Sequence, residues 1–234
     1  TKASTLDRLE TRSLEFLDLL RSATGLSTAD FGISGSLLVG LHTNTSDIDI
    51  IVYGSNSGIK VATALRSLHD EKGPIRKYNR SELLDLRESR LMSESMDFQS
   101  FQRHEDRKSL LGVFWEDDYF VRCIKNPGET NERYGDSTYI QIGGATIEAV
   151  IMDDSDGIFT PCRYLIDHVC TIEGIKLGCP SEIVSFRGRF CEQARVGEKV
   201  LAKGHVEKVV SQSGERFRLV VGEGRYDRFE TRGN

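Results

Sequence analysis

The sequence predicts an α+β protein: a mixed sheet flanked by helices, followed by a small antiparallel β-barrel-like domain. Near the N-terminus, leucines recur at helical spacing with charged residues between them. From residue 112 onward, short β-rich runs alternate with Gly-containing or acidic turns. Of the 234 residues, 38% are hydrophobic and 29% are charged. A chain of this length and composition can bury the core of one large or two small domains.

The first half of the chain alternates helices with strands. An amphipathic helix is expected over residues 4–22. A short apolar segment around Phe31 then leads to Gly35 and Ser36, and the run Asp47–Val52 predicts a strand whose second half is continuously apolar. Further helical spacing covers two segments separated by a Gly-Pro pair, namely residues 59–70 and 81–92.

The second half of the chain is richer in strands. We place a domain boundary in the acidic turn near residue 156, so that residues 1–156 form a first domain and residues 157–234 a small β-rich accessory domain. The polar end from residue 222 is expected to fray. The strands are expected at 112–115, 119–124, 138–142, 145–152, 183–190, 200–210 and 217–221.

Composition narrows the classes of function. The sequence has neither an apolar run of the roughly 20 residues that span a bilayer nor a secretory signal, so no membrane role is expected. Five cysteines without a close Cys-x-x-Cys pair favour reduced thiols and a cytoplasmic location. The net charge of −5 argues against broad non-specific binding to nucleic acid.

The segment from Gly35 to Asp49 is the candidate for chemistry. Side chains on a strand alternate between faces, so Asp47 and Asp49 point the same way, about 7 Å apart along the backbone. Two like charges at that distance favour a cation between them, and carboxylate oxygens select Mg²⁺ or Mn²⁺. Gly35 allows a sharp bend, and Ser36 adds a hydroxyl where a helix would begin. Free N–H groups at such a turn can hold phosphates.

This pattern, Gly35-Ser36, a spacer, then Asp47-Ile48-Asp49, resembles the nucleotidyltransferase superfamily that includes DNA polymerase beta, poly(A) polymerases and CCA-adding enzymes. The chain also resembles uncharacterised microbial predicted nucleotidyltransferases. The resemblance implies a nucleotidyltransferase fold over residues 1–156. It implies transfer of a nucleoside monophosphate from a nucleoside triphosphate such as ATP to an acceptor hydroxyl, with release of pyrophosphate. The acceptor is left open between a small molecule, an RNA end and a protein. One departure is Val39, where many compact members carry Arg.

The superfamily implies a third metal-binding carboxylate on a later strand. Glu148 is the candidate, because it is the only charge in the apolar run 145–151, where burial of an unpaired carboxylate is costly. The alternative is that Glu148 faces solvent. Asp97 and the acidic turn at 153–156 are rival positions.

Basic side chains could neutralise pyrophosphate as it leaves, and Arg122 and Lys108 are the candidates. Arg122 lies inside an expected strand, and Lys108 lies in a basic helical segment. Either could instead form an ordinary salt bridge.

Two other classes of protein are alternatives for this pattern. The run Asp47–Val52 also resembles the first motif of haloacid-dehalogenase-type phosphatases, but there the nucleophilic Asp ends an apolar strand, whereas here the apolar strand follows Asp47. The remaining alternative is a non-catalytic nucleotide- or RNA-binding protein on the same scaffold. Metal-dependent turnover would separate it from an enzyme.

Overall fold

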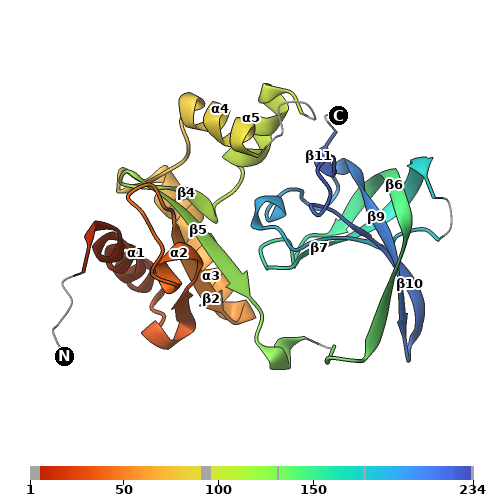
Figure 1. Cartoon of the computed structure of the whole chain (residues 1–234), viewed down its shortest axis with the longest axis horizontal. Coiled ribbons are helices and arrows are strands. Elements are labelled where there is room, and N and C mark those ends of the chain that lie inside the picture. The colour runs from red at the N-terminus through yellow and green to blue at the C-terminus, as the bar shows by residue number, and fades with distance from the viewer. Residues whose placement is uncertain (1–5, 91–95, 131, 176–177, 233–234) are drawn as a thin grey trace. The chain divides into compact units, whose positions relative to one another are not determined.

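The computed structural model describes residues 6–90, 96–130, 132–175 and 178–232 (Figure 1). The chain forms two compact units, and neither is continuous in sequence. The first consists of residues 1–79 and 109–129, and the second of residues 80–108 and 130–234.

The first unit is built on a five-stranded mixed sheet with the strand order β1-β2-β5-β4-β3. Only β2 and β5 run parallel, and the other neighbours are antiparallel. The strands span β1 Phe31–Ile33, β2 Ile48–Tyr53, β3 Ile75–Arg76, β4 Leu111–Phe114 and β5 Asp117–Ile124.

Helices cover one face of this sheet. The long helices α1 (Arg8–Thr24) and α3 (Ser55–Asp70) contact each other and both contact β2. Along β2 the buried residues are Ile48, Ile50 and Val52, which therefore face these helices, whereas Asp49 and Ile51 point to the opposite face. The single-turn helix α2 (Gly35–Leu38) and two 3₁₀ turns (Thr28–Asp30 and Pro127–Glu129) complete the unit.

The second unit combines two helices with a six-stranded sheet. The helices are α4 (Arg80–Ser89) and α5 (Phe98–Asp106), and a 3₁₀ turn spans Gly188–Phe190. No helix in the described ranges is long and apolar enough to cross a membrane. The strands span β6 Ser137–Asp153, β7 Cys162–Gly174, β8 Glu182–Ser185, β9 Lys199–Ser211, β10 Gly214–Val220 and β11 Arg228–Thr231.

The strand pairings of the second unit run in a cycle. The sheet order is β10-β8-β7-β6-β9-β11, and β10 also pairs with β9. The expectation of an antiparallel sheet needs one correction, because β8 and β10 are parallel. The α+β class is confirmed, with two mixed sheets and flanking helices.

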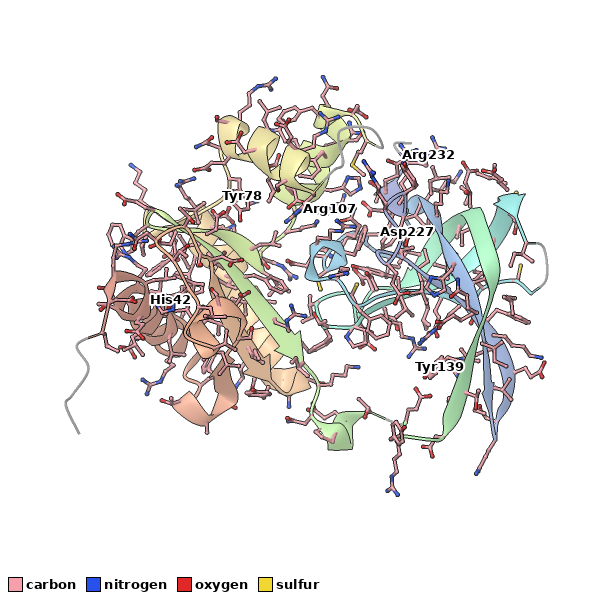
Figure 2. All side chains as sticks on the ribbon, in the orientation of Figure 1. His42, Tyr78, Arg107, Tyr139, Asp227 and Arg232 are labelled. Carbon is pink, nitrogen blue, oxygen red and sulfur yellow. The ribbon has the colours of Figure 1, made fainter. Side chains whose placement is uncertain are left out.

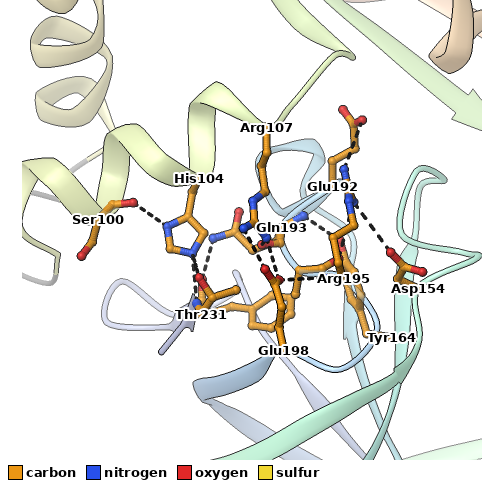
Figure 3. Close-up of polar contacts among 12 residues, drawn as sticks. Ser100, His104, Arg107, Asp154, Tyr164, Glu192, Gln193, Arg195, Glu198 and Thr231 are labelled. Atoms are coloured by element: carbon orange, nitrogen blue, oxygen red, sulfur yellow. Dashed lines mark hydrogen bonds and ion pairs between the residues drawn. The ribbon is translucent and has the colours of Figure 1, made fainter. Parts of the chain in front are cut away.

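Helix α5 belongs to the second unit because its side chains bond to that unit's β-rich part (Figure 3). Arg107 donates to both carboxylate oxygens of Glu198, at 2.7 and 2.8 Å. The Nε2 atom of His104 accepts a hydrogen bond from the backbone N–H of Thr231 at 3.0 Å. The segment 80–108 is therefore an insertion between β3 and β4 of the first unit.

The predicted domain boundary near residue 156 differs from the observed division. Residues 130–156 group with the second unit, because β6 pairs with β7 and β9 along its length. Two expected strands, at 138–142 and 145–152, are one strand. The strands β7 and β11 were not expected, and β11 lies in the segment that was expected to fray.

Candidate active site

The turn after β1 is held against β2. Gly35 has a φ of 62°, in the left-handed region, and the backbone N–H of Ser34 donates to the carbonyl of Asp49 at 3.0 Å. A Cβ atom on Gly35 would overlap Oδ2 of Asp49 and lie 2.9 Å from its Cγ. Glycine is therefore required here both by the backbone angle and by the carboxylate beside it.

The predicted helix start is displaced by two residues from the sequence expectation. Helix α2 begins at Gly35 with Ser34 as its N-cap, so Ser36 lies inside its first turn. Because α2 has only four residues, its dipole is small. Any phosphate contact at this turn would come from individual N–H groups and the Ser36 hydroxyl.

Asp47 and Asp49 come together as the sequence predicts. Asp47 is exposed and directly precedes β2, and Asp49 is half-buried on the strand. Burial first, and then the negative charge of Asp47, raise the pKa of Asp49 to about 6, against the opposing effect of the nearby Arg122. A half-buried carboxylate whose ionisation a second carboxylate disfavours, with a cationic side chain nearby, forms the electrostatic centre of this unit.

Arg122 reaches this centre from the neighbouring strand. In the parallel register of β2 and β5, Asp49 lies opposite Phe120 and Ile51 opposite Arg122. The guanidinium of Arg122 packs over the Phe120 ring at 5.1 Å. Its positive charge acts on Asp49, whose pKa it lowers. A contact with pyrophosphate stays a prediction.

The same register identifies an acid that the sequence reasoning missed. Asp118 lies two residues before Phe120, as Asp47 lies two residues before Asp49. Side chains alternate along β5, so Asp118 shares a face with Phe120 and Arg122. The register begins with Ile48 opposite Tyr119, and continuing it back by one residue brings Asp118 to the level of Asp47, on strands about 4.8 Å apart.

These three aspartates fit a hard divalent cation by their chemistry. All are carboxylates, the donors that Mg²⁺ and Mn²⁺ prefer. The pKa of Asp49 is raised by burial and then by Asp47, so the ionised form of Asp49 is disfavoured in the absence of a cation. The three aspartates do not form as tight a group as Asp7, Glu10 and His42, whose ligand atoms all lie within 4.8 Å of one another. Cation binding would therefore draw Asp47, Asp49 and Asp118 closer.

The group of Asp7, Glu10 and His42 has a structural explanation. Asp7 is the N-cap of α1: it accepts from the N–H of Glu10, and Glu10 accepts in return from the N–H of Asp7, both at 2.9 Å. Nε2 of His42 contacts the remaining oxygen of Asp7 at 2.5 Å. The carboxylates are thus used by helix capping.

Glu148 lies in the second unit, on a different sheet from Asp49. Its side chain is 50% exposed and pairs with Arg232 at 3.5 Å. Its neighbours Ile147 and Ala149 are buried, so alternation along β6 turns Glu148 outward. The apolar surroundings that suggested a functional acid are the inward face of β6. This environment agrees with the alternative that Glu148 faces solvent, and its role as a metal ligand stays a prediction. Asp118 is an acid on the same sheet as Asp49.

Lys108 also lies in the second unit, where its side chain is only 2% exposed. Its Nζ donates to Glu105 at 2.7 Å and to the carbonyl of Arg189 at 2.6 Å. The predicted phosphate contact has no support, because the ammonium group is buried in these bonds. Glu105 lies only three residues before Lys108, so a local pair could have been anticipated, whereas the contact with Arg189 is remote in the chain and could not.

The rival acidic positions are also structural. Asp97 is the N-cap of α5 and accepts from the N–H of Ser100 at 3.0 Å. In the acidic turn, Asp153 accepts from the N–H of Ser155 at 2.8 Å, and Asp154 lies 3.9 Å from Arg195. Both belong to the second unit.

The chain is 30% identical over 207 residues to a protein of Methanocaldococcus jannaschii called uncharacterized protein MJ1086. The match covers 88% of this chain and 59% of the archaeal protein, so the chain spans less than two thirds of that relative's length. No protein-family model matches the chain, and no solved structure matches it. The name of this relative assigns it no activity.

Proposed function

We propose that this protein is a metal-dependent nucleotidyltransferase, which transfers a nucleoside monophosphate from a nucleoside triphosphate to an acceptor hydroxyl. The observation that carries the proposal is the left-handed turn at Gly35, packed against Asp49 with Asp47 close by. This turn brings phosphate-binding N–H groups next to metal-binding carboxylates, which is the arrangement that a metal-nucleotide complex requires.

In the proposed reaction, Asp47, Asp49 and Asp118 hold the cation, and the turn at Gly35 and Ser36 orients the triphosphate. Bound Mg²⁺ or Mn²⁺ would supply charge stabilisation at the α phosphate and at the attacking and leaving oxygens. A bond forms between the acceptor oxygen and the α phosphorus, the bond from the α phosphorus to the bridging oxygen breaks, and pyrophosphate leaves. The acceptor proton passes to solvent. Arg122 is placed to offset the negative charge that develops.

The position of the aspartates argues against the phosphatase alternative. Asp47 and Asp49 lie at the beginning of β2, and the buried positions of that strand follow them. A phosphatase of the type considered above would carry its nucleophile at the strand's other end. The alternative of a non-catalytic nucleotide- or RNA-binding protein predicts binding without turnover.

We further propose that the second unit is a small β-barrel that contributes to acceptor choice. Its support is the cycle of strand pairings β6-β7-β8-β10-β9, a number of strands that also builds the OB-fold barrel. Two basic side chains of this unit are paired with acids: Lys208 with Glu215 at 2.7 Å and Arg218 with Glu207 at 2.7 Å. This pairing supports the expectation that broad nucleic-acid binding is weak. Cytoplasmic location stays a prediction.

The proposed function is tested by thermal unfolding with and without Mg²⁺ and each nucleoside triphosphate. A ligand that binds only the folded state raises the melting temperature, by an amount set by its concentration relative to Kd. We expect a rise in the wild type that needs metal and nucleotide together, and no rise in Asp49→Asn. Arg66→Gln, a change on α3 away from the acidic face, serves as the matched control and should respond like the wild type. An equal rise in Asp49→Asn would place the nucleotide elsewhere.

A further inference from the structure

The first turns of α1 contact the two segments that carry the site aspartates. Arg8 donates to both carboxylate oxygens of Asp117, at 2.8 and 2.6 Å. The same guanidinium donates to the backbone carbonyl of Asn44 at 3.2 Å. Asp117 directly precedes Asp118 on β5, and Asn44 lies in the loop that leads into Asp47. One side chain thus bridges the starts of two strands.

The carboxylate in this bridge is buried. The Asp117 side chain is only 5% exposed, and Arg12 adds a second cation, with Nε at 3.5 Å from Oδ2. The hydrogen bond to Asp117, and then the charge of Asp117, raise the pKa of Arg8. Exposed ion pairs contribute little to stability. A guanidinium that donates two hydrogen bonds to a buried carboxylate, however, also fixes the orientation of the two planar groups relative to each other. The bridge therefore sets where β5 begins relative to α1.

The loop before β2 is fastened to the same end of α1 at a second point. Nε2 of His42, a residue labelled in Figure 2, contacts Asp7, the residue next to Arg8, at 2.5 Å. Between these anchors the loop closes on itself: the N–H of Thr43 donates to Oγ of Ser46 at 3.0 Å, and the N–H of Ser46 donates to the carbonyl of Thr43 at 3.2 Å. The path into Asp47 is thus fixed by its contacts with α1.

We propose that Arg8 is a positioning residue of the metal site, which sets the spacing between Asp118 and Asp47 by holding Asp117 and the loop at Asn44 together. The inference rests on the proposed function, because it assigns Arg8 a role in metal-nucleotide binding. Three like-charged aspartates repel one another, so their separation without a cation depends on what holds the backbone beneath them. Arg8 reduces the rearrangement that cation binding requires.

The test measures Mn²⁺ affinity by electron paramagnetic resonance, with ATP and GTP tried in turn, for the wild type and for Arg8→Met. Methionine keeps much of the side-chain length and removes every donor. Arg21→Met is the matched control, because Arg21 lies on the same helix and pairs only with the exposed Asp18 among the described ion pairs. Far-UV circular dichroism at the assay temperature shows that each variant is folded.

We expect Arg8→Met to weaken Mn²⁺ binding at least tenfold while Arg21→Met stays within twofold of the wild type. Asp117→Asn, which keeps the shape and removes the charge, should weaken binding by a similar factor. The double variant Arg8→Met/Asp117→Asn should bind Mn²⁺ no more weakly than the single variant that binds it less well, because both changes break the same bridge. If Arg8→Met does not fold, Mn²⁺ affinity is measured in Arg8→Lys and Asp117→Asn instead.

Wild-type affinity in folded Arg8→Met, or equal losses in Arg8→Met and Arg21→Met, would overturn the positioning role and leave the proposed function standing. A wild type that binds no Mn²⁺ with either nucleotide would overturn the proposed function, and the role of Arg8 with it. A loss in Asp49→Asn under the same conditions confirms that the measured cation is the one at the aspartates.

Discussion

Each unit contains a group of acidic and basic side chains, and the two groups are balanced differently. In the second unit, Glu105 is 3% exposed and its Oε1 accepts from Lys108 at 2.7 Å and from Arg90 at 3.0 Å. Burial alone would raise the pKa of Glu105, but the two cations lower it below its ordinary value. In the first unit, Asp47 raises the pKa of an already desolvated Asp49, and Arg122 offsets this only in part. In the second unit, the carboxylate of Glu105 has two cationic partners, and we call these three residues the matched group. In the first unit, Arg122 compensates Asp47 and Asp49 only in part, and we call these two aspartates the unmatched group.

This difference separates a structural role from a binding role. A buried carboxylate with two cationic partners is part of what holds α4, α5 and the β-rich part of the second unit together. An acid whose pKa is raised by burial and by a neighbouring carboxylate carries an unfavourable electrostatic energy when ionised, which a bound cation would relieve. Charge balance, rather than the number of charged residues, indicates where this protein would bind a ligand.

The largest expected change in stability comes from a substitution in the matched group. Glu105→Gln leaves Lys108 and Arg90 without their carboxylate in a buried site, so we expect a loss of about 3 to 5 kcal/mol in the free energy of unfolding by urea. The double variant Glu105→Gln/Lys108→Met should lose less than the sum of the single variants, because it also removes the stranded cation. A loss below about 1 kcal/mol for Glu105→Gln would contradict the structural role.

A smaller effect concerns pH and the contact between α5 and β11. Burial lowers the pKa of His104 to about 4, so the folded protein holds a neutral imidazole that accepts from the N–H of Thr231. Because the unfolded chain takes up the proton near pH 6.5, stability is complete above that value and is lost as the pH falls toward 4, by about 3 kcal/mol at most. His104→Gln, which keeps an acceptor, should flatten this part of the stability curve. An unchanged pH dependence in the variant would show that other groups cause it.

The smallest expected change in stability is a gain rather than a loss, and it comes from a substitution in the unmatched group. The folded protein keeps a proton on Asp49 up to pH about 6, so its contribution to stability is lost as the pH rises from about 4 through 6. Asp49→Asn removes this cost, and we expect a gain of order 1 kcal/mol at pH 8 without metal, after allowing for solvent screening of a half-exposed group. Near pH 4 the variant and the wild type should unfold alike. Destabilisation at pH 8 would show that Asp49 is a structural acid.

The sequence predicted the local part of the site and missed the non-local part. Gly35, Asp47 and Asp49 were predictable because a tight turn and strand alternation are properties of a short segment. Asp118 could not be chosen over Glu148, because that choice depends on which strand lies beside β2. The run 117–124 begins with two acids, and alternation alone could have placed Asp118 on the face of Arg122.

The same limit applies to the fold. Helical spacing correctly predicted segments near α3 and α4, but it could not show that residues 80–108 pack with the second unit, since their partners lie as far along the chain as Thr231. The strand β7 was missed because charged residues such as Arg163 and Asp167 interrupt its apolar positions. A single cut at residue 156 would leave β6 without β7 and β9, so truncation there would not isolate either unit.

The most direct test of the central claim follows the label of a nucleoside triphosphate into an acceptor. The protein would be incubated with Mg²⁺ or Mn²⁺, fractions of a cell extract, and each triphosphate labelled at either the α or the γ phosphate. Attack at the α phosphate predicts that the α label enters an acceptor while the γ label appears in pyrophosphate, and that Asp47→Asn and Asp49→Asn abolish both signals. Transfer of the γ label to the acceptor, or α labelling that persists in both variants, would contradict the account.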